Sequence, residues 1–96
     1  MFVITFDLMT AATAAAHPKG VSQAYTDIGR TLARFGFEGI QGSVYQTKRT
    51  ELANMYRAVE ALKALPWLAR CVRDLRVHRI DYGDDFTAVL KDIDRA

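Results

Sequence analysis

The first seven residues, MFVITFD (residues 1–7), decide the fold. Residues 2–6 are aromatic or mostly β-branched and leave no polar face. Such a run predicts a strand that is buried on both sides. The run ends on a carboxylate, Asp7, and the ends of strands are where functional side chains often gather. Asp7 is therefore the first candidate functional residue.

Length and composition predict one globular domain over residues 1–96. Half of the residues are hydrophobic and the net charge is +2, which permits binding to a polyanion without requiring it. The single cysteine, Cys71, excludes an internal disulfide framework and a multi-cysteine zinc site. We expect it to be a small core residue in a protein of the reducing cytoplasm. A secretory signal is disfavoured because Asp7 interrupts the apolar run, and no stretch is long enough to span a membrane.

Hydrophobic spacing and breaker residues predict the first half of the chain. Residues 8–20 read as a loop that ends in Pro-Lys-Gly. A helix with one apolar face is expected over residues 21–35, with Ser22 as its N-cap and Gly36 at its end. Residues 37–40 and 43–47 are short extended segments, joined by a turn at Gln41 and Gly42.

The second half contains another helix, a strand and a terminal helix. Thr50 is the expected cap of a helix whose buried face carries Leu52, Met55, Tyr56, Val59 and Leu62. Pro66 interrupts this helix, and Trp67 and Leu68 then form a short extra turn. Residues 72–80 alternate as a strand, residues 82–84 form a turn, and Phe86, Val89, Leu90 and Ile93 mark a last amphipathic helix.

The resulting order is β-α-β-β-α-β followed by a C-terminal helix. This is the ferredoxin-like arrangement of the α+β class, with one antiparallel sheet and both main helices on one face. The first strand is then central, and the third and fourth strands flank it in the antiparallel direction. The end of the first strand therefore lies near the starts of the other two.

Side-chain alternation selects which residues meet at this end of the sheet. If Phe2, Ile4 and Phe6 face the helices, Asp7 faces the other way. The same reasoning, with Val44 and Leu75 as core residues, turns four more side chains to the helix-free face: Ser43, Tyr45, Asp74 and Arg76. Val3 and Thr5 lie beside this polar group, so we expect a second subunit to cover the face in a twofold homodimer.

The residue types at this position suit phosphodiester chemistry in two ways. In a metal-dependent version, Asp7 from each subunit holds Mg²⁺, Asp74 and Ser43 support it, and a bound water attacks phosphorus. In a metal-free version, the carboxylates act as general acid and base in the proton transfers at the phosphodiester. Arg76 neutralises a phosphate in either version.

The chain resembles the virulence-associated protein D (VapD) family over nearly its whole length. The resemblance is carried by the segments FDL (6–8), AY with Asp27 (24–27), GFEGIQGSVY (36–45), WLARCVRDLR (67–76) and DDFTAVLK (84–91). It implies a ferredoxin-like homodimer related to the small CRISPR-associated adaptation nucleases. It also implies endoribonuclease activity, in some members as the toxin of a toxin–antitoxin pair.

The family motifs map their site residues onto Asp7, Ser43 and Asp74. RNA contacts are expected from Tyr45, Arg76 and Lys19. The segment after the first strand departs from the family pattern, because residues 9–16 carry no charge. Lys19 partly substitutes for the missing charges. The departure motivates an alternative function, a dimeric nucleic-acid-binding or scaffold module without catalysis that docks an antitoxin or another protein.

Structural roles compete with each of these assignments. Asp7 can bind nearby backbone N–H groups, Asp74 can pair with Arg73 or Arg76, and Ser43 can cap the turn at Gly42. The two histidines are expected outside the site. His17 precedes Pro18 in the predicted loop and should be solvated, and His78 lies farther along its strand than Asp74.

Overall fold

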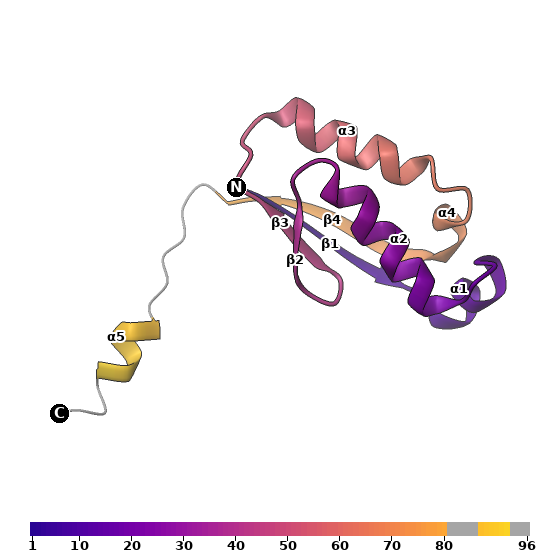
Figure 1. Cartoon of the computed structure of the whole chain (residues 1–96), viewed down its shortest axis with the longest axis horizontal. Coiled ribbons are helices and arrows are strands. Elements are labelled where there is room, and N and C mark those ends of the chain that lie inside the picture. Colours follow the sequence, from indigo (N-terminus) through magenta and orange to yellow (C-terminus); the bar gives the residue numbers. More distant parts are fainter. Residues whose placement is uncertain (81–86, 93–96) are drawn as a thin grey trace.

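A four-stranded antiparallel sheet with the order β2-β3-β1-β4 forms one layer of the fold (Figure 1). The computed structural model describes residues 1–80 and 87–92. In chain order the elements are β1 (Phe2–Leu8), α1 (Thr10–Ala16), α2 (Val21–Ala33), β2 (Glu38–Gln41), β3 (Val44–Thr47), α3 (Leu52–Lys63), α4 (Leu68–Cys71), β4 (Val72–Arg79) and α5 (Thr87–Asp92). The central position of β1 and its two antiparallel neighbours are as predicted.

The helices α2 and α3 lie together on one side of the sheet (Figure 1). Their inward faces and the inward face of β1 form the core, in which the largest fully buried aliphatic side chains are Ile4, Ile28, Leu32 and Leu62. Cys71 is also fully buried, as expected. The architecture confirms the ferredoxin-like α+β prediction.

The alternation of β1 follows its sequence. Phe2, Ile4 and Phe6 belong to the core under the helices. Asp7 is exposed and Thr5 is half-buried on the other face. Leu8 returns to the core, so the strand ends with an apolar residue directly after the acid. This alternation fixes Asp7 on the helix-free face at the end of the central strand.

The segment after β1 was predicted as a loop, and this prediction is wrong. Residues 10–16 form helix α1, because alanine has the best intrinsic helix propensity and five of these seven residues are alanine. The buried hydroxyl of Thr13 donates a 2.8 Å hydrogen bond to the carbonyl of Met9, which satisfies it within the helix. The Met9 N–H donates to the Cys71 carbonyl at 2.8 Å and ties α1 to α4.

Neither predicted helix cap is observed. The N-cap of α2 is Gly20 instead of Ser22, since the positive φ of Gly20 lets the chain enter the helix earlier. The N-cap of α3 is Glu51 instead of Thr50, and neither helix has a side-chain cap hydrogen bond. The predicted end of the first long helix is close to the observed one, with Gly36 at φ +80° after the last helical turn.

The buried face of α3 is narrower than the predicted one, which also included the alanines of this helix. Met55, Ala58 and Leu62 are buried, whereas Leu52 and Tyr56 are 50% and 60% exposed. Ala58 is fully buried, and the larger side chains of Met55 and Leu62 are buried with it. The short turn after Pro66 is confirmed as α4, with Trp67 and Leu68 buried.

The predicted turn at residues 82–84 and two apolar residues of the terminal helix, Phe86 and Ile93, lie outside the described residues. Within residues 1–80 and 87–92, no helix is long and apolar enough to cross a membrane.

Two leucines on α3 provide a matched test of this packing. Leu62 is 2% exposed and Leu52 is 50% exposed. We expect Leu62→Ala to lower the free energy of unfolding by about 2–5 kcal/mol, because it removes buried contacts and leaves a cavity. We expect Leu52→Ala to change it by no more than about 0.5 kcal/mol. Urea denaturation followed by circular dichroism measures both, and equal losses would contradict the observed orientation of α3.

Candidate active site

Two carboxylates face each other across the β1–β4 pairing. Asp7 and Asp74 are direct partners in the antiparallel register, and both are on the helix-free face. The next pair on this face is Thr5 with Arg76. The sequence prediction that Asp7, Asp74 and Arg76 meet at one end of the sheet is confirmed. His78 pairs with Val3, four residues away from Asp7 along β1, and is outside this group as expected.

Each acid is bound by its own arginine. Arg73 Nη1 donates to Asp7 Oδ2 at 3.2 Å, and Arg76 Nε donates to both oxygens of Asp74 at 3.1 Å. The register shifts between Asp7 and Leu8, so a bulge lies at Arg73 on β4. Bulges re-aim side chains, and this one gives Arg73 access to Asp7. The structural alternative considered for Asp74, an ion pair with Arg76, is therefore present.

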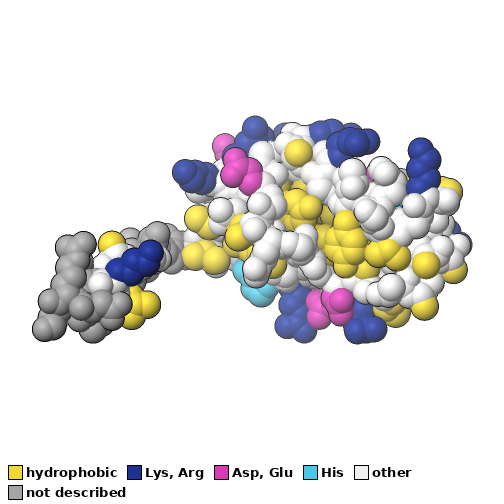
Figure 2. All heavy atoms as spheres, turned by 60° about the horizontal axis from the view of Figure 1, so that its bottom comes forward, with side chains coloured by type: hydrophobic (Ala, Val, Ile, Leu, Met, Phe, Trp, Pro, Cys, Tyr) yellow, Lys and Arg dark blue, Asp and Glu magenta, His cyan; other side chains and the backbone are white. Residues whose placement is uncertain are grey.

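These ion pairs are at the surface. The side chains of Asp7 and Arg73 are 56% and 65% exposed, and those of Asp74 and Arg76 are 40% and 70% exposed. Exposed pairs contribute only about 0–1 kcal/mol to stability, so the fold does not depend on them. The guanidinium groups offset the repulsion between two acids placed directly opposite each other. Figure 2 shows acidic side chains beside basic ones at the surface, next to an area of hydrophobic side chains.

Ser43 is at the same end of the sheet but in the turn between β2 and β3. Its carbonyl accepts a 3.2 Å hydrogen bond from the N–H of Phe6, the residue before Asp7. The turn itself comprises Gly42 and Ser43 rather than Gln41 and Gly42. Ser43 is half-buried, and its role in the site remains a prediction.

The orientation predicted for Tyr45 is wrong. Tyr45 pairs with Ile4, and its ring stacks on that of Phe6 with centroids 6.0 Å apart, on the side of the helices. The physical reason lies in two glycines. A Cβ added at Gly29 would come within 2.7 Å of the Tyr45 hydroxyl, and one added at Gly39 within 3.2 Å of the ring. The space that these glycines leave accepts the tyrosine, and Val44, opposite Thr5, takes the helix-free face.

The donor set of one chain does not match a magnesium site. Mg²⁺ prefers octahedral oxygen ligation with several waters. Here the two carboxylates already bind guanidinium groups, which would repel a cation. Among the residues that the structure describes, no three or more His, Cys, Asp or Glu side chains are grouped so as to hold a metal ion.

The sequence of the chain is similar to those of several known proteins of the same length. No family model matches the chain. The endoribonuclease VapD homolog of Neisseria gonorrhoeae is 53% identical over 91 residues, which cover 95% of this chain and 99% of that protein. Endoribonuclease VapD of Haemophilus influenzae is 47% identical with the same coverage. That of Dichelobacter nodosus is 38% identical over 95% of this chain and 98% of its own length. The chain belongs to the VapD family.

This VapD protein contains a second acid–base pair, His17 with Asp27, that the sequence patterns do not predict. His17 is 6% exposed, so the expectation that it is solvated is wrong. The backbone N–H of Lys19 donates to His17 Nδ1 at 3.0 Å. Nε2 therefore carries the ring proton when the ring is neutral, and it contacts Asp27 Oδ2 at 2.7 Å. The ring also packs edge-on against Trp67 at 4.8 Å.

This arrangement makes His17 a structural anchor rather than a base for catalysis. Both ring nitrogens bind the protein itself, and the imidazole joins the end of α1 to α2 and α4. Hydrophobic spacing does not predict this contact, because it predicts a loop over residues 8–20. His17 is the C-cap residue of α1, so the position of this helix places the ring beside Asp27.

Lys19 lies apart from the acid pair. It lines an open hollow of about 330 Å³. The other residues that line this hollow include His17, Asp27, Arg30 and Trp67. An RNA contact from Lys19 would thus be made at a separate position from Asp7, and it remains a prediction.

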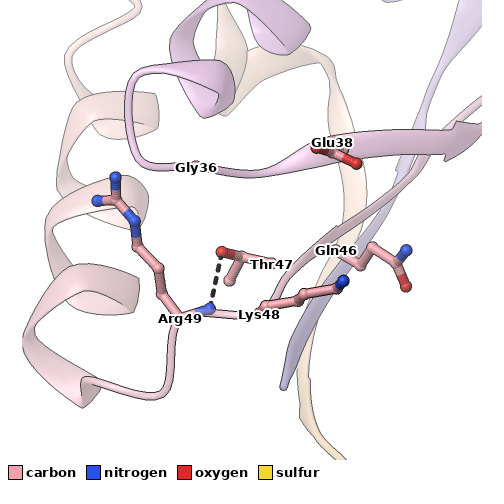
Figure 3. Close-up of a pocket in the computed structure, with 6 residues that line it drawn as sticks. All are labelled: Gly36, Glu38, Gln46, Thr47, Lys48 and Arg49. Carbon is pink, nitrogen blue, oxygen red and sulfur yellow. Dashed lines mark hydrogen bonds between the residues drawn. The ribbon is translucent and has the colours of Figure 1, made fainter.

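Another hollow lies at the opposite end of the sheet. It has a volume of about 220 Å³ and is lined by Gly36, Glu38, Gln46, Thr47, Lys48 and Arg49 (Figure 3). Thr47 pairs with Phe2, the first residue of β1, whereas Asp7 is near the end of that strand. The Thr47 hydroxyl accepts the Arg49 N–H at 3.2 Å. This hollow is distant along the sheet from the candidate site and is not part of it.

The Asp27 contact predicts a specific loss of stability in acid. Hydrogen bonds from His17 and Gln23 lower the pKa of Asp27 below its usual 3.8. A carboxyl whose pKa is depressed in the folded state stabilises the protein above its unfolded pKa, and this contribution disappears as the pH falls through the folded pKa. Asp27→Asn should therefore be less stable than the wild type at neutral pH, with a difference that narrows below about pH 3.8.

The free energy of unfolding in urea from pH 2 to pH 7 measures this difference. Glu38→Gln, a change at an exposed carboxylate on β2, is the control and should follow the wild-type curve. A wild-type and Asp27→Asn difference that stays constant over the whole pH range would contradict the prediction.

Proposed function

We propose that this VapD-family protein is an endoribonuclease that cleaves RNA phosphodiesters at the Asp7–Asp74 pair. The observation that carries the proposal is the direct cross-strand pairing of these acids, flanked by Arg73 and Arg76. It is supported by relatives of matching length that are named endoribonucleases. Carboxylates and guanidinium groups at one exposed position are the groups that proton transfer and phosphate binding require.

The exposed ion pairs indicate a role for each group: the arginine binds phosphate and the carboxylates transfer protons. A phosphate oxygen is an alternative acceptor for a guanidinium, so RNA can take the place of Asp74 at Arg76. The released Asp74 carboxylate accepts the proton of the 2′-OH as the 2′-oxygen bonds to phosphorus. The acid pair returns a proton to the 5′-oxygen as its bond to phosphorus breaks, which leaves a 2′,3′-cyclic phosphate. The chain supplies both protonation roles without a metal, and the metal-free version of the mechanism is the one that we propose.

The homodimer and the toxin role extend this proposal. Val3, Thr5 and Val44 lie side by side on the helix-free face, and a second copy on this face would bring two acid pairs together. We propose that RNA cleavage in the cytoplasm makes the protein the toxin of a toxin–antitoxin pair, with an antitoxin protein as its partner. Growth arrest on induction of the wild type, and not of Asp7→Asn, in a bacterial host would support this role.

A second candidate function is a dimeric nucleic-acid-binding or scaffold module. It is favoured by two observations: α1 carries no charge, and both acids are bound by arginines in the single chain. Such a module would bind RNA or a partner protein without cleaving it.

The acid pair gives the first test of the proposed activity. Asp7→Asn and Asp74→Asn keep the size of the side chains and remove their charge. We expect each variant to cleave a mixed RNA about 10²–10⁴-fold more slowly than the wild type, the range lost with a general acid or base. Glu60→Gln, at an exposed acid on α3, is the matched control and should cleave normally. Gel-resolved cleavage with and without EDTA gives the rates.

Each outcome of this assay has a distinct meaning. Equal cleavage by Asp7→Asn and the wild type rules out the catalytic assignment. Absence of cleavage by every protein favours the binding module. Cleavage that EDTA abolishes contradicts the metal-free version while leaving the acids in place.

The phosphate-binding role of Arg76 gives the second test. In the Asp7→Asn background, RNA is bound without being cut. We expect Arg76→Ala to weaken binding and to reduce the slope of log affinity against log salt concentration by about 0.7, the value for one phosphate contact on a single strand. Fluorescence anisotropy measures both quantities, and Arg57→Ala on the exposed face of α3 is the control. An unchanged slope would exclude a phosphate contact at Arg76.

A further inference from the structure

A continuous groove lies along α2 on the helical side of the fold. The hollow beside Lys19 shares Asp27 and Arg30 with a second hollow of about 210 Å³, whose lining extends to Arg34 and Leu65. Because two residues belong to both linings, the two hollows are adjacent. Together they extend from the segment after α1 to the C-terminal end of α2.

The charges that line this groove are mostly positive. Lys19, Arg30 and Arg34 are exposed cations, and Asp27 is the acid that the described residues contribute to the lining. Three cations and one carboxylate give a net charge of +2, which equals the net charge of the whole chain. The other charges of the protein therefore cancel, and its excess positive charge is in the groove. A groove lined by one sign of charge attracts ligands of the opposite sign, here polyanions.

The cations of the groove are available to a ligand, whereas its acid is engaged. None of the ion pairs formed within residues 1–80 and 87–92 includes Lys19, Arg30 or Arg34. The Asp27 carboxylate accepts hydrogen bonds from His17 at 2.7 Å and from Gln23 at 3.0 Å. The two arginines of the candidate active site differ, because each of them is bound to a carboxylate. An anion could therefore bind in the groove without displacing an ion pair.

The spacing of the two arginines suits an extended nucleic-acid strand. Arg30 and Arg34 are four residues apart at the end of α2, so they lie on the same side of the helix and about 6 Å apart along its axis. Each guanidinium can then bind a different phosphate of one strand. Leu65 and Trp67 add apolar surface to the same lining, against which a ribose or a base can pack.

The groove begins at the end of the sheet where the acid pair lies. Asp7 is near the end of β1, α1 follows directly, and Lys19 comes soon after α1. Figure 1 shows α1 and α4 together at this end of the sheet, beside the start of α2. The acids are on the helix-free face and the groove is on the helical side. A strand that reaches both must pass around α1 or α4 and must be several nucleotides long.

We propose that this groove binds the backbone of single-stranded RNA at a distance from the acid pair, through phosphate contacts of Lys19, Arg30 and Arg34. The inference rests on the proposed function in taking RNA as the ligand. It does not depend on the acids, and it holds equally for a protein that binds RNA without cleaving it.

The salt dependence of RNA binding tests the groove. We expect Arg30→Gln and Arg34→Gln each to reduce the slope of log affinity against log salt concentration by about 0.7, the value for one phosphate contact on a single strand. Glutamine is polar and suits a helix, so these changes mainly remove charge. Fluorescence anisotropy with a 2′-O-methyl RNA oligonucleotide in EDTA measures the slope. The methylated 2′-oxygen cannot attack phosphorus, so the strand stays intact.

Arg57→Gln is the matched control for these variants. Arg57 is an exposed arginine on α3 that lines a different hollow with Arg49 and Asn54, and we expect the change to keep the wild-type slope. Wild-type slopes for both Arg30→Gln and Arg34→Gln would overturn the proposal. So would an equal reduction by Arg57→Gln, because it would indicate an effect of net charge alone. Absence of RNA binding by the wild type would overturn both the groove and RNA as the ligand.

Cleavage of long and short substrates separates the groove from the acid pair. We expect Arg34→Gln to raise KM for a long single-stranded RNA several-fold with kcat unchanged, because it removes binding that the ground state and the transition state share. A dinucleotide is too short to reach the groove from the acids and should be cleaved at the wild-type rate. Slower dinucleotide cleavage by Arg34→Gln would overturn the remote contact. Asp7→Asn should show the reverse pattern, lost cleavage with the salt slope of the groove contacts retained, so failure of the catalytic assignment and failure of the groove are distinguishable.

Discussion

The antiparallel pairing of β1 with β4 positions both the hydrophobic core and the candidate site. β1 is the central strand, and its alternate side chains fill the core under α2 and α3. A shift of this register by one residue would turn every side chain of one strand to the other face. The core therefore fixes the register, and the register places Asp7 opposite Asp74. The position of the acids is a consequence of how the apolar residues pack.

The electrostatic repulsion between Asp7 and Asp74 is unfavourable at this position, and arginines of the same sheet offset it. Two like charges directly opposite each other are unfavourable. The bulge at Arg73 and the alternation that places Arg76 beside Asp74 bring a guanidinium to each acid. Because these pairs are exposed, they add little stability and exchange readily with other ions. Solvent exposure makes these ion pairs weak structural contacts, and it also leaves their arginines accessible to a phosphate.

The His17–Asp27 contact differs from these pairs in its surroundings. The imidazole is buried, and its two nitrogens have partners in Lys19 and Asp27. Through Asp27 in the middle of α2 and Trp67 before α4, the ring connects the end of α1 to both helices. A hydrogen-bonded group that is buried in this way holds elements together. The chain thus has two acid–base arrangements, one that supports the fold and one that faces solvent.

Local patterns of residues are sufficient to predict the order of the strands and of the two main helices, the central strand, the core face of β1 and the meeting of Asp7 with Asp74. These features follow from local alternation and helical periodicity, which each segment carries in its own residues. Tertiary structure decided the side of Tyr45, because the space at Gly29 and Gly39 exists only once α2 and β2 are assembled. It also decided the burial of His17, which depends on an alanine-rich helix whose formation the hydrophobic pattern does not indicate. Packing between distant segments is a property of the assembled chain, and no single stretch of residues encodes it.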